Sequence, residues 1–250
     1  MCIGPQTPSY AMNESLSNLE QTTIYEQHSK HFVAVDCSIF GYEQGELKLL
    51  LYPRSFEPAK GNWSLMGGFV QTDESLEEAA RRVLLQTTGL HNIFLEQAMA
   101  FSQPGRDPGA RVISMTFVAL IRIDWHDREL VKERGAQWWP VTKLPKLIFD
   151  HQSMIQNALL LLQQKASINL ISKELLPDRF TLMQLKNLYE AIFQRPFDPG
   201  NFRKKILSLD MLERLDEKNT TESKKGAFYY QFKKEESGNR AERIIKFPGS

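Results

Sequence analysis

The chain has 250 residues and a net charge of only +1, so no overall basic or acidic bias points to a partner. A hydrophobic content of 42% supports a sizeable core, in one large or two ordinary domains. Apolar runs are too short for a membrane span, and residues 1–30 lack the apolar centre of a signal peptide. Cys2 and Cys37 are too few for a disulfide framework, which favours a cytoplasmic location.

The first third of the chain predicts an extension followed by strands. Residues 1–30 are rich in Ser, Gln, Asn and Thr, so we expect a flexible segment, with a short helix near 15–21. Strands are predicted over 31–40 and 46–52, with turn chemistry at 41–45 between them.

A helix is predicted from about Ser75 to Thr88. Glu77 and Glu78 are typical of a helix N-terminus next to a start at Thr72 or Asp73, and Gly89 is typical of a C-terminal end. Its buried stripe comprises Leu76, Ala79, Ala80, Val83 and Leu84. Strands over 94–102, 111–123 and 137–140 follow, and then an amphipathic helix over 150–165.

This predicted helix carries a motif that resembles a Nudix box. The box reads Gly, five residues, Glu, seven residues, then Arg-Glu-U-x-Glu-Glu-x-Gly-U, with U aliphatic. Its matching positions are Gly68, Glu74, Arg82, Leu84, Gly89 and Leu90. Val83, Gln86 and Thr87 replace the three helical glutamates, so this face cannot offer the converging carboxylates that magnesium requires. We therefore expect a catalytically silent domain with no metal and no cofactor.

Residues 166–234 predict a second domain. Thr181 is a candidate N-cap for one helix, and Asp198 with Pro199 starts another that reaches about Ser208. Strands over 211–215 and 227–232 flank a polar turn at 217–225. Two helices and a hairpin in this order are typical of a winged helix-turn-helix.

The basic residues of this second domain predict double-stranded operator DNA as a partner. A recognition helix presents side chains to base edges, and a wing contacts phosphate. The alternative is a solvated helix face and a Lys-rich turn. The candidate DNA contacts are Asn201, Arg203, Lys204, Lys205, Lys224 and Lys225.

A degenerate Nudix domain before a winged helix resembles the Nudix-related bacterial transcriptional regulators. One branch, the NrtR regulators, senses ADP-ribose and controls NAD synthesis genes; another (AraR-like) controls sugar utilisation and responds to L-arabinose. The runs at 57–59, 63–70, 106–109, 148–151 and 201–204 resemble the arabinose branch. The resemblance implies an α+β protein: a Nudix αβα sandwich with a mixed sheet at 31–165, a winged helix-turn-helix at 166–234 and a disordered tail at 235–250.

We therefore expect a homodimeric repressor of sugar-utilisation genes with L-arabinose as its small sugar effector. The alternatives are an ADP-ribose-sensing regulator of NAD metabolism genes and a magnesium-dependent Nudix hydrolase. Two alternatives stay open at the predicted site, Trp63 as a core residue and the loop charges as incidental, and for Glu74 with Arg82 an ion pair internal to the box is the default interpretation. The His residues show no metal-binding spacing. The candidate effector contacts are Arg54, Trp63, Glu74, Arg82, Arg106 and Asp107.

Overall fold

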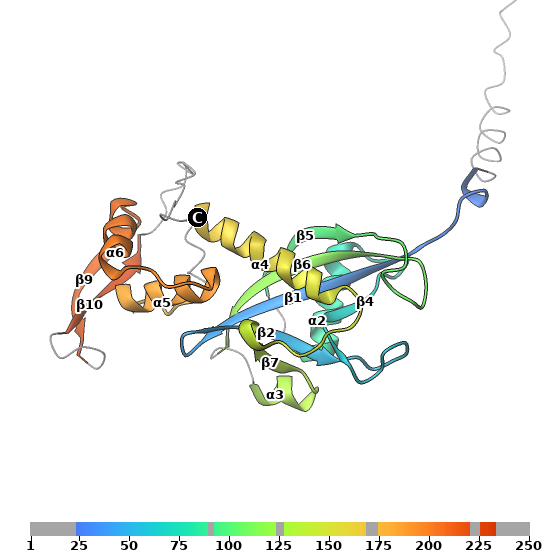
Figure 1. The fold of residues 1–250 in the computed structure, drawn as a ribbon, viewed down its shortest axis with the longest axis horizontal. Helices are drawn as coiled ribbons and strands as arrows, with labels where there is room; N and C mark the ends of the chain where they lie inside the picture. The colour runs from blue at the N-terminus through green and yellow to red at the C-terminus, as the bar shows by residue number, and fades with distance from the viewer. Residues whose placement is uncertain (1–23, 90–92, 124–127, 169–174, 221–225, 234–250) are drawn as a thin grey trace, which may run out of the picture.

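The computed structural model describes residues 24–89, 93–123, 128–168, 175–220 and 226–233 (Figure 1). The predicted helix at 15–21, the tail at 235–250, Lys224 and Lys225 lie outside the described residues. Among the described helices, none is long and apolar enough to cross a membrane.

A mixed sheet organises the N-terminal part of the chain. Within the described residues it has seven strands, in the order β3-β2-β1-β6-β5, with β4 on β1 and β7 on β2. β1 and β6 pair in parallel and the other pairs are antiparallel. The bounds are β1 Phe32–Glu43, β2 Glu46–Pro53, β3 Trp63–Ser64, β4 Met66–Phe69, β5 Glu96–Phe101, β6 Val112–Arg122 and β7 Gln137–Pro140.

The first strand is longer than predicted, because Gly41 is a packing glycine and not a turn residue. A Cβ on Gly41 would lie 2.6 Å from the Ile123 side chain and 2.8 Å from that of Trp138. The turn falls instead at Gln44 and Gly45, both of which have positive φ.

Helices cover both faces of the sheet, since alternate side chains of a strand point to opposite faces. Val35, Cys37 and Ile39 of β1 share a core with α2 (Leu76–Thr88), whereas Phe40 shares one with α4 (His151–Ile168). The result is an αβα sandwich, and Figure 1 shows α4 lying across the sheet. A short helix, α3 (Arg128–Glu133), was not predicted.

The bounds of α2 agree with the predicted helix from about Ser75 to Thr88, but its N-cap is neither Thr72 nor Asp73. Ser75 is the N-cap: its hydroxyl accepts a hydrogen bond from the backbone N–H of Glu78 at 3.2 Å, and the Glu78 carboxylate accepts one from the Ser75 N–H at 2.7 Å. This reciprocal capping box satisfies two N-terminal donors, so Thr72 and Asp73 stay outside the helix. Gly89 ends the helix in the left-handed conformation, as predicted.

The C-terminal part has the element order of a winged helix. β8 (Phe180–Thr181) precedes α5 (Leu182–Phe193) and α6 (Pro199–Ser208), and a hairpin of β9 (Leu212–Asn219) and β10 (Ala227–Phe232) follows. The sheet order is β8-β10-β9. Thr181 and Asp198 cap the two helices as predicted. β9 extends through residues 217–219, which were predicted as turn.

The two parts meet through the last turns of α4, which runs past the boundary predicted at residue 165. The Gln163 amide donates to the Ile192 carbonyl of α5 at 2.9 Å, and the buried Tyr189 hydroxyl donates to the Ala166 carbonyl at 3.3 Å. One hydrophobic cluster contains Met154 of α4 and Leu188 of α5. Because α4 begins at the other end of the sandwich, it connects the two parts physically.

Candidate functional site

A cavity of about 310 Å³ opens between the sheet, α2 and the loop before α4, a size usual for small-molecule sites. Its lining combines charged, hydroxyl and aromatic side chains with the backbone of two glycines. The lining residues are Ala34, Asp36, Tyr52, Arg54, Ser55, Phe56, Ser64, Leu65, Gly67, Gly68, Phe69, Gln86, Thr87, Arg106, Asp107, Val112, Phe149 and His151.

Asp36 forms the floor of this cavity. It lies in β1 opposite Gly67 of β4, where a Cβ would be 2.2 Å from its Oδ1. Only glycine therefore leaves room for this carboxylate. The Ser114 hydroxyl donates to Asp36 Oδ2 at 2.5 Å, and the Arg106 guanidinium lies 3.8 Å from the same oxygen.

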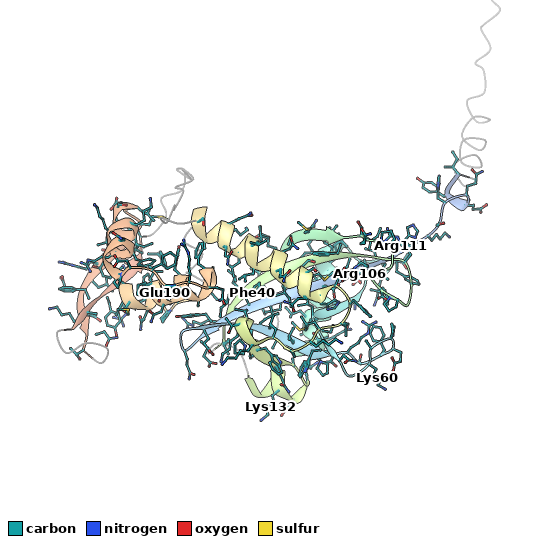
Figure 2. All side chains as sticks on the ribbon, viewed as in Figure 1. Phe40, Lys60, Arg106, Arg111, Lys132 and Glu190 are labelled. Atoms are coloured by element: carbon teal, nitrogen blue, oxygen red, sulfur yellow. The ribbon has the colours of Figure 1, made fainter. Side chains whose placement is uncertain are left out.

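Arg106, labelled in Figure 2, is held mainly by Asp150, the residue before α4. Its Nε and Nη2 donate to the two Asp150 carboxylate oxygens at 2.8 and 2.7 Å, and its side chain is only 4% exposed. A bidentate pair of this kind fixes the guanidinium in position. Arg106 therefore lines the cavity, but its charge is already balanced from within the protein.

His151 lies next to Asp36 and is neutral. Burial lowers its pKa below the usual value, an effect that Asp36 and Asp150 only partly oppose. The backbone N–H of Leu65 donates to His151 Nδ1 at 3.1 Å, so the ring proton resides on Nε2. Nε2 lies 3.8 Å from Asp36 Oδ1.

Arg54 provides the cation at the rim. Its Nε donates to the Phe56 carbonyl at 3.1 Å, and its guanidinium lies 3.9 Å from the Phe56 ring centre and 5.1 Å from that of Phe149. Burial lowers the pKa of Arg54, but an arginine keeps its proton in proteins. Unlike Arg106, it forms no salt bridge with any residue that the structure describes.

Neutral side chains form the α2 wall of the cavity. Gln86 and Thr87 line it, while Val83 is buried beneath Gly68, where a Cβ would lie 2.7 Å from the valine. Thr87 Oγ1 donates to the Val83 carbonyl at 2.8 Å. No group of three His, Cys, Asp or Glu residues suited to a metal ion occurs in the part of the chain that the structure describes. These residues do not fit the divalent cation that a Nudix box ordinarily holds.

Half of the predicted effector contacts lie elsewhere. Arg54, Arg106 and Asp107 line the cavity, whereas Trp63, Glu74 and Arg82 do not. Trp63 belongs to the core side and packs edge-on against Trp139, with ring centres 5.4 Å apart. These three residues are not among those that line the cavity, so a role for them as effector contacts stays a prediction.

Glu74 and Arg82 form a pair internal to the box. The guanidinium donates to the two carboxylate oxygens at 2.5 and 2.8 Å and to the Phe69 carbonyl at 2.9 Å. The hydrogen bond from Arg82 is the main reason that the pKa of Glu74 is lowered to about 2. The pair fastens α2 to β4 and so shapes the cavity without entering it.

Sequence reasoning missed Asp36, Phe149 and His151. Asp36 is a charged residue inside an apolar strand. That position could have indicated a functional residue, because an isolated carboxylate is costly to bury. Phe149 has a positive φ of 45°, and nothing in the neighbouring sequence predicts that conformation for a phenylalanine. His151 was set aside for lacking metal-ligand spacing, although its role here is hydrogen bonding.

The predicted DNA-binding helix α6 presents the expected side chains. Asn201, Arg203 and Lys204 are exposed and Lys205 is half-buried. Phe202 and Ile206 anchor the opposite face of the helix in the core. The hairpin adds two cations that were not predicted: Arg214 and Lys218 of β9 both lie 4.6 Å from the Phe228 ring centre.

Comparison with known proteins identifies both parts. Residues 30–158 match the model of the NUDIX domain, and residues 172–232 match that of the NrtR DNA-binding winged helix domain. The N-terminal part is therefore a Nudix fold with a mixed sheet, and the C-terminal part is a DNA-binding winged helix.

Three relatives illustrate the similarity. The ADPR responsive transcriptional repressor NtrR of Acinetobacter baylyi is 30% identical over 220 residues, which span 86% of this chain and 88% of the relative. The crystal structure of Shewanella oneidensis NrtR with a 27mer DNA matches with a TM-score of 0.69 and 30% identity, over 80% of this chain and 93% of that one. The ADP-ribose pyrophosphatase of Methanocaldococcus jannaschii is 36% identical over 126 residues, half of this chain and 71% of the relative.

These matches overturn the predicted sugar-responsive branch. The Acinetobacter relative aligns through both domains and is named for its response to ADPR, and the matching winged helix model is of the NrtR type. Short motifs such as 106–109 therefore misled the prediction of L-arabinose and of sugar-utilisation genes. The chain belongs to the NrtR family, in which a Nudix domain is followed by a winged helix DNA-binding domain.

Proposed function

We propose that this protein is a transcriptional repressor that binds ADP-ribose in its Nudix cavity and controls genes of NAD metabolism. The observation that carries the proposal is the cavity itself. It combines a rim cation, Arg54, with a neutral wall at Gln86 and Thr87, where a hydrolase needs carboxylates. The similarity to an ADPR responsive repressor over most of both chains supports the choice of ligand.

The rim of the cavity suits a nucleoside diphosphate sugar. The Arg54 guanidinium is held between the faces of Phe56 and Phe149, so its position is fixed before a ligand arrives. A diphosphate needs such a cation once magnesium is not available to neutralise it. The aromatic faces and the polar floor offer surfaces for a base and for ribose hydroxyls, respectively.

Hydrolysis of ADP-ribose is the second candidate, because an ADP-ribose pyrophosphatase is 36% identical over the Nudix half. The α2 wall argues against it. Val83 is buried under Gly68, and Gln86 and Thr87 carry no charge, so three carboxylates are missing from the helix that holds the metal in a working box. We propose that the domain binds its ligand without cleaving it.

Regulation requires that ADP-ribose bind two states of the protein with different affinity. The geometry offers α4 as the connecting element: His151, at its first turn, lines the cavity, and Gln163, near its last turn, is bonded to α5. We further propose a homodimer, since a symmetric operator with one winged helix on each half-site is the usual arrangement.

Calorimetric titration tests this function. ADP-ribose is added to the full-length protein in EDTA, and then with magnesium while the product is assayed. We expect saturable binding in EDTA that weakens in Arg54→Ala, no response to L-arabinose and no product with magnesium. Binding that requires magnesium and is followed by turnover near 1 per second would establish a hydrolase instead.

A further inference from the structure

Two atoms of buried residues that line the cavity have hydrogen-bonding capacity that the protein leaves unused. Asp36 is 6% exposed and His151 is 3% exposed, and both line the cavity. Asp36 Oδ2 is occupied by Ser114, but Oδ1 has no hydrogen-bond partner among the described residues. His151 Nδ1 accepts from Leu65, whereas Nε2 has no acceptor at hydrogen-bonding distance in the same part of the chain.

The two atoms are complementary and too far apart to satisfy each other. The separation of 3.8 Å exceeds the usual range for a nitrogen–oxygen hydrogen bond. Because Nδ1 is an acceptor and the pKa of His151 is lowered, Nε2 carries the only ring proton and is a donor. Asp36 Oδ1 is an acceptor only. A ligand that enters the cavity covers both atoms, so a ligand group that satisfies both is favoured over one that leaves them unpaired.

A hydroxyl group satisfies both, because one oxygen accepts from Nε2 and donates its own proton to Oδ1. A separation of 3.8 Å is compatible with one oxygen about 2.8 Å from each atom, at the apex of a triangle. An ammonium has no lone pair for Nε2–H, and a carboxylate or phosphate has no proton for Oδ1 and would face a buried anion. Among these groups, the pair therefore favours a neutral hydroxyl.

We propose that Asp36 and His151 together bind one hydroxyl of the ligand and make that hydroxyl a condition of tight binding. The proposal rests on the proposed function and refines it: the hydroxyl belongs to one of the two riboses of ADP-ribose, and the neighbouring Ser114 and Arg106 hold Asp36 in place for it. A site built around a hydroxyl discriminates strongly against analogues that lack it, because its buried groups are then left unpaired.

The test is a calorimetric comparison of ADP-ribose with analogues that each lack one ribose hydroxyl. In the wild-type protein we expect one analogue to bind about 10-fold to 100-fold more weakly than ADP-ribose. In Asp36→Asn the amide oxygen takes the place bonded to Ser114 and an NH₂ replaces Oδ1. The site then offers two donors, so the hydroxyl can still accept from both but no longer donates to a carboxylate, and we expect the penalty for that analogue to become smaller.

Two histidine variants form a matched pair. His151→Asn retains an acceptor for the Leu65 N–H but removes the donor at Nε2, so it should also reduce the penalty. His151→Gln keeps an amide donor near the position of Nε2 and should therefore preserve the penalty for the analogue. Arg54→Ala is the control: it should weaken ADP-ribose and the analogue by the same factor and leave their ratio unchanged.

The outcomes separate the two claims. A wild-type protein that does not bind ADP-ribose at all overturns the proposed function and, with it, this inference. Binding of ADP-ribose with an analogue penalty that is as large in Asp36→Asn and His151→Asn as in the wild type overturns the inference alone. A penalty that is lost in Arg54→Ala also overturns the inference, because the penalty would then depend on how tightly the whole ligand is bound and not on the Asp36–His151 pair. If Asp36→Asn lacks a cooperative melting transition and is therefore not folded, the comparison of His151→Asn with His151→Gln tests the inference.

Discussion

Removing Asp150 should destabilise the Nudix domain by leaving a buried cation without its main partner. Arg106 is 4% exposed and bonded by both Asp150 oxygens. Breaking a buried pair from one side costs about 3–5 kcal/mol. Asp150 is 24% exposed and Asp36 still lies 3.8 Å from the guanidinium, so we place Asp150→Ala at the lower end, about 3 kcal/mol.

Thermal denaturation measures this effect. A loss of about 3 kcal/mol lowers the melting temperature by about 6–12 °C in a domain of this size. Glu96→Ala provides the control, because it breaks the half-exposed pair with Lys165, which should contribute at most about 1 kcal/mol. Adding Arg106→Met to Asp150→Ala should recover part of the loss, since no uncompensated cation is then buried. An Asp150→Ala protein that melts no lower than Glu96→Ala would refute this reasoning.

Three further predictions follow from the same structure. Burial lowers the pKa of His151, so below about pH 6.5 the unfolded chain binds a proton that the folded protein does not; the free energy of unfolding should therefore fall as the pH decreases, and less steeply in His151→Asn. Ser75→Ala removes the α2 N-cap and should lower the free energy of unfolding by about 1 kcal/mol in urea titrations. Arg214→Ala and Lys218→Ala should weaken DNA binding regardless of sequence, and the slope of log affinity against log salt concentration should flatten by about one unit per lost phosphate contact. Fluorescence anisotropy at several salt concentrations measures this slope, which would not change if the hairpin does not contact DNA.

Helix ends were predictable where the signal is local. Asp198 followed by Pro199 starts α6, Thr181 caps α5 and Gly89 ends α2, because each of these residues acts on neighbouring backbone groups. Gly41 misled the prediction because its reason is tertiary. It makes room for Ile123 and Trp138, and no neighbouring residue indicates that need.

The cavity was only partly predictable for the same reason. Asp36 and His151 are separated by 115 positions. They meet because Asp36, like Phe40, lies on the face of β1 that α4 covers, and His151 begins α4. The substitutions Val83, Gln86 and Thr87 are visible in the sequence because the box has a fixed spacing. The ligand was mispredicted because short motifs such as 106–109 position loops and ion pairs, and these do not specify what binds.

The coupling between cavity and DNA is the central claim, and fluorescence anisotropy tests it directly. A labelled duplex is first selected from a random-sequence pool by the full-length protein, and its affinity is then measured in EDTA with and without ADP-ribose. We expect ADP-ribose to change operator affinity by about 5-fold to 150-fold, with Arg54→Ala requiring more of it and L-arabinose having no effect. An operator affinity that saturating ADP-ribose leaves unchanged would contradict the account.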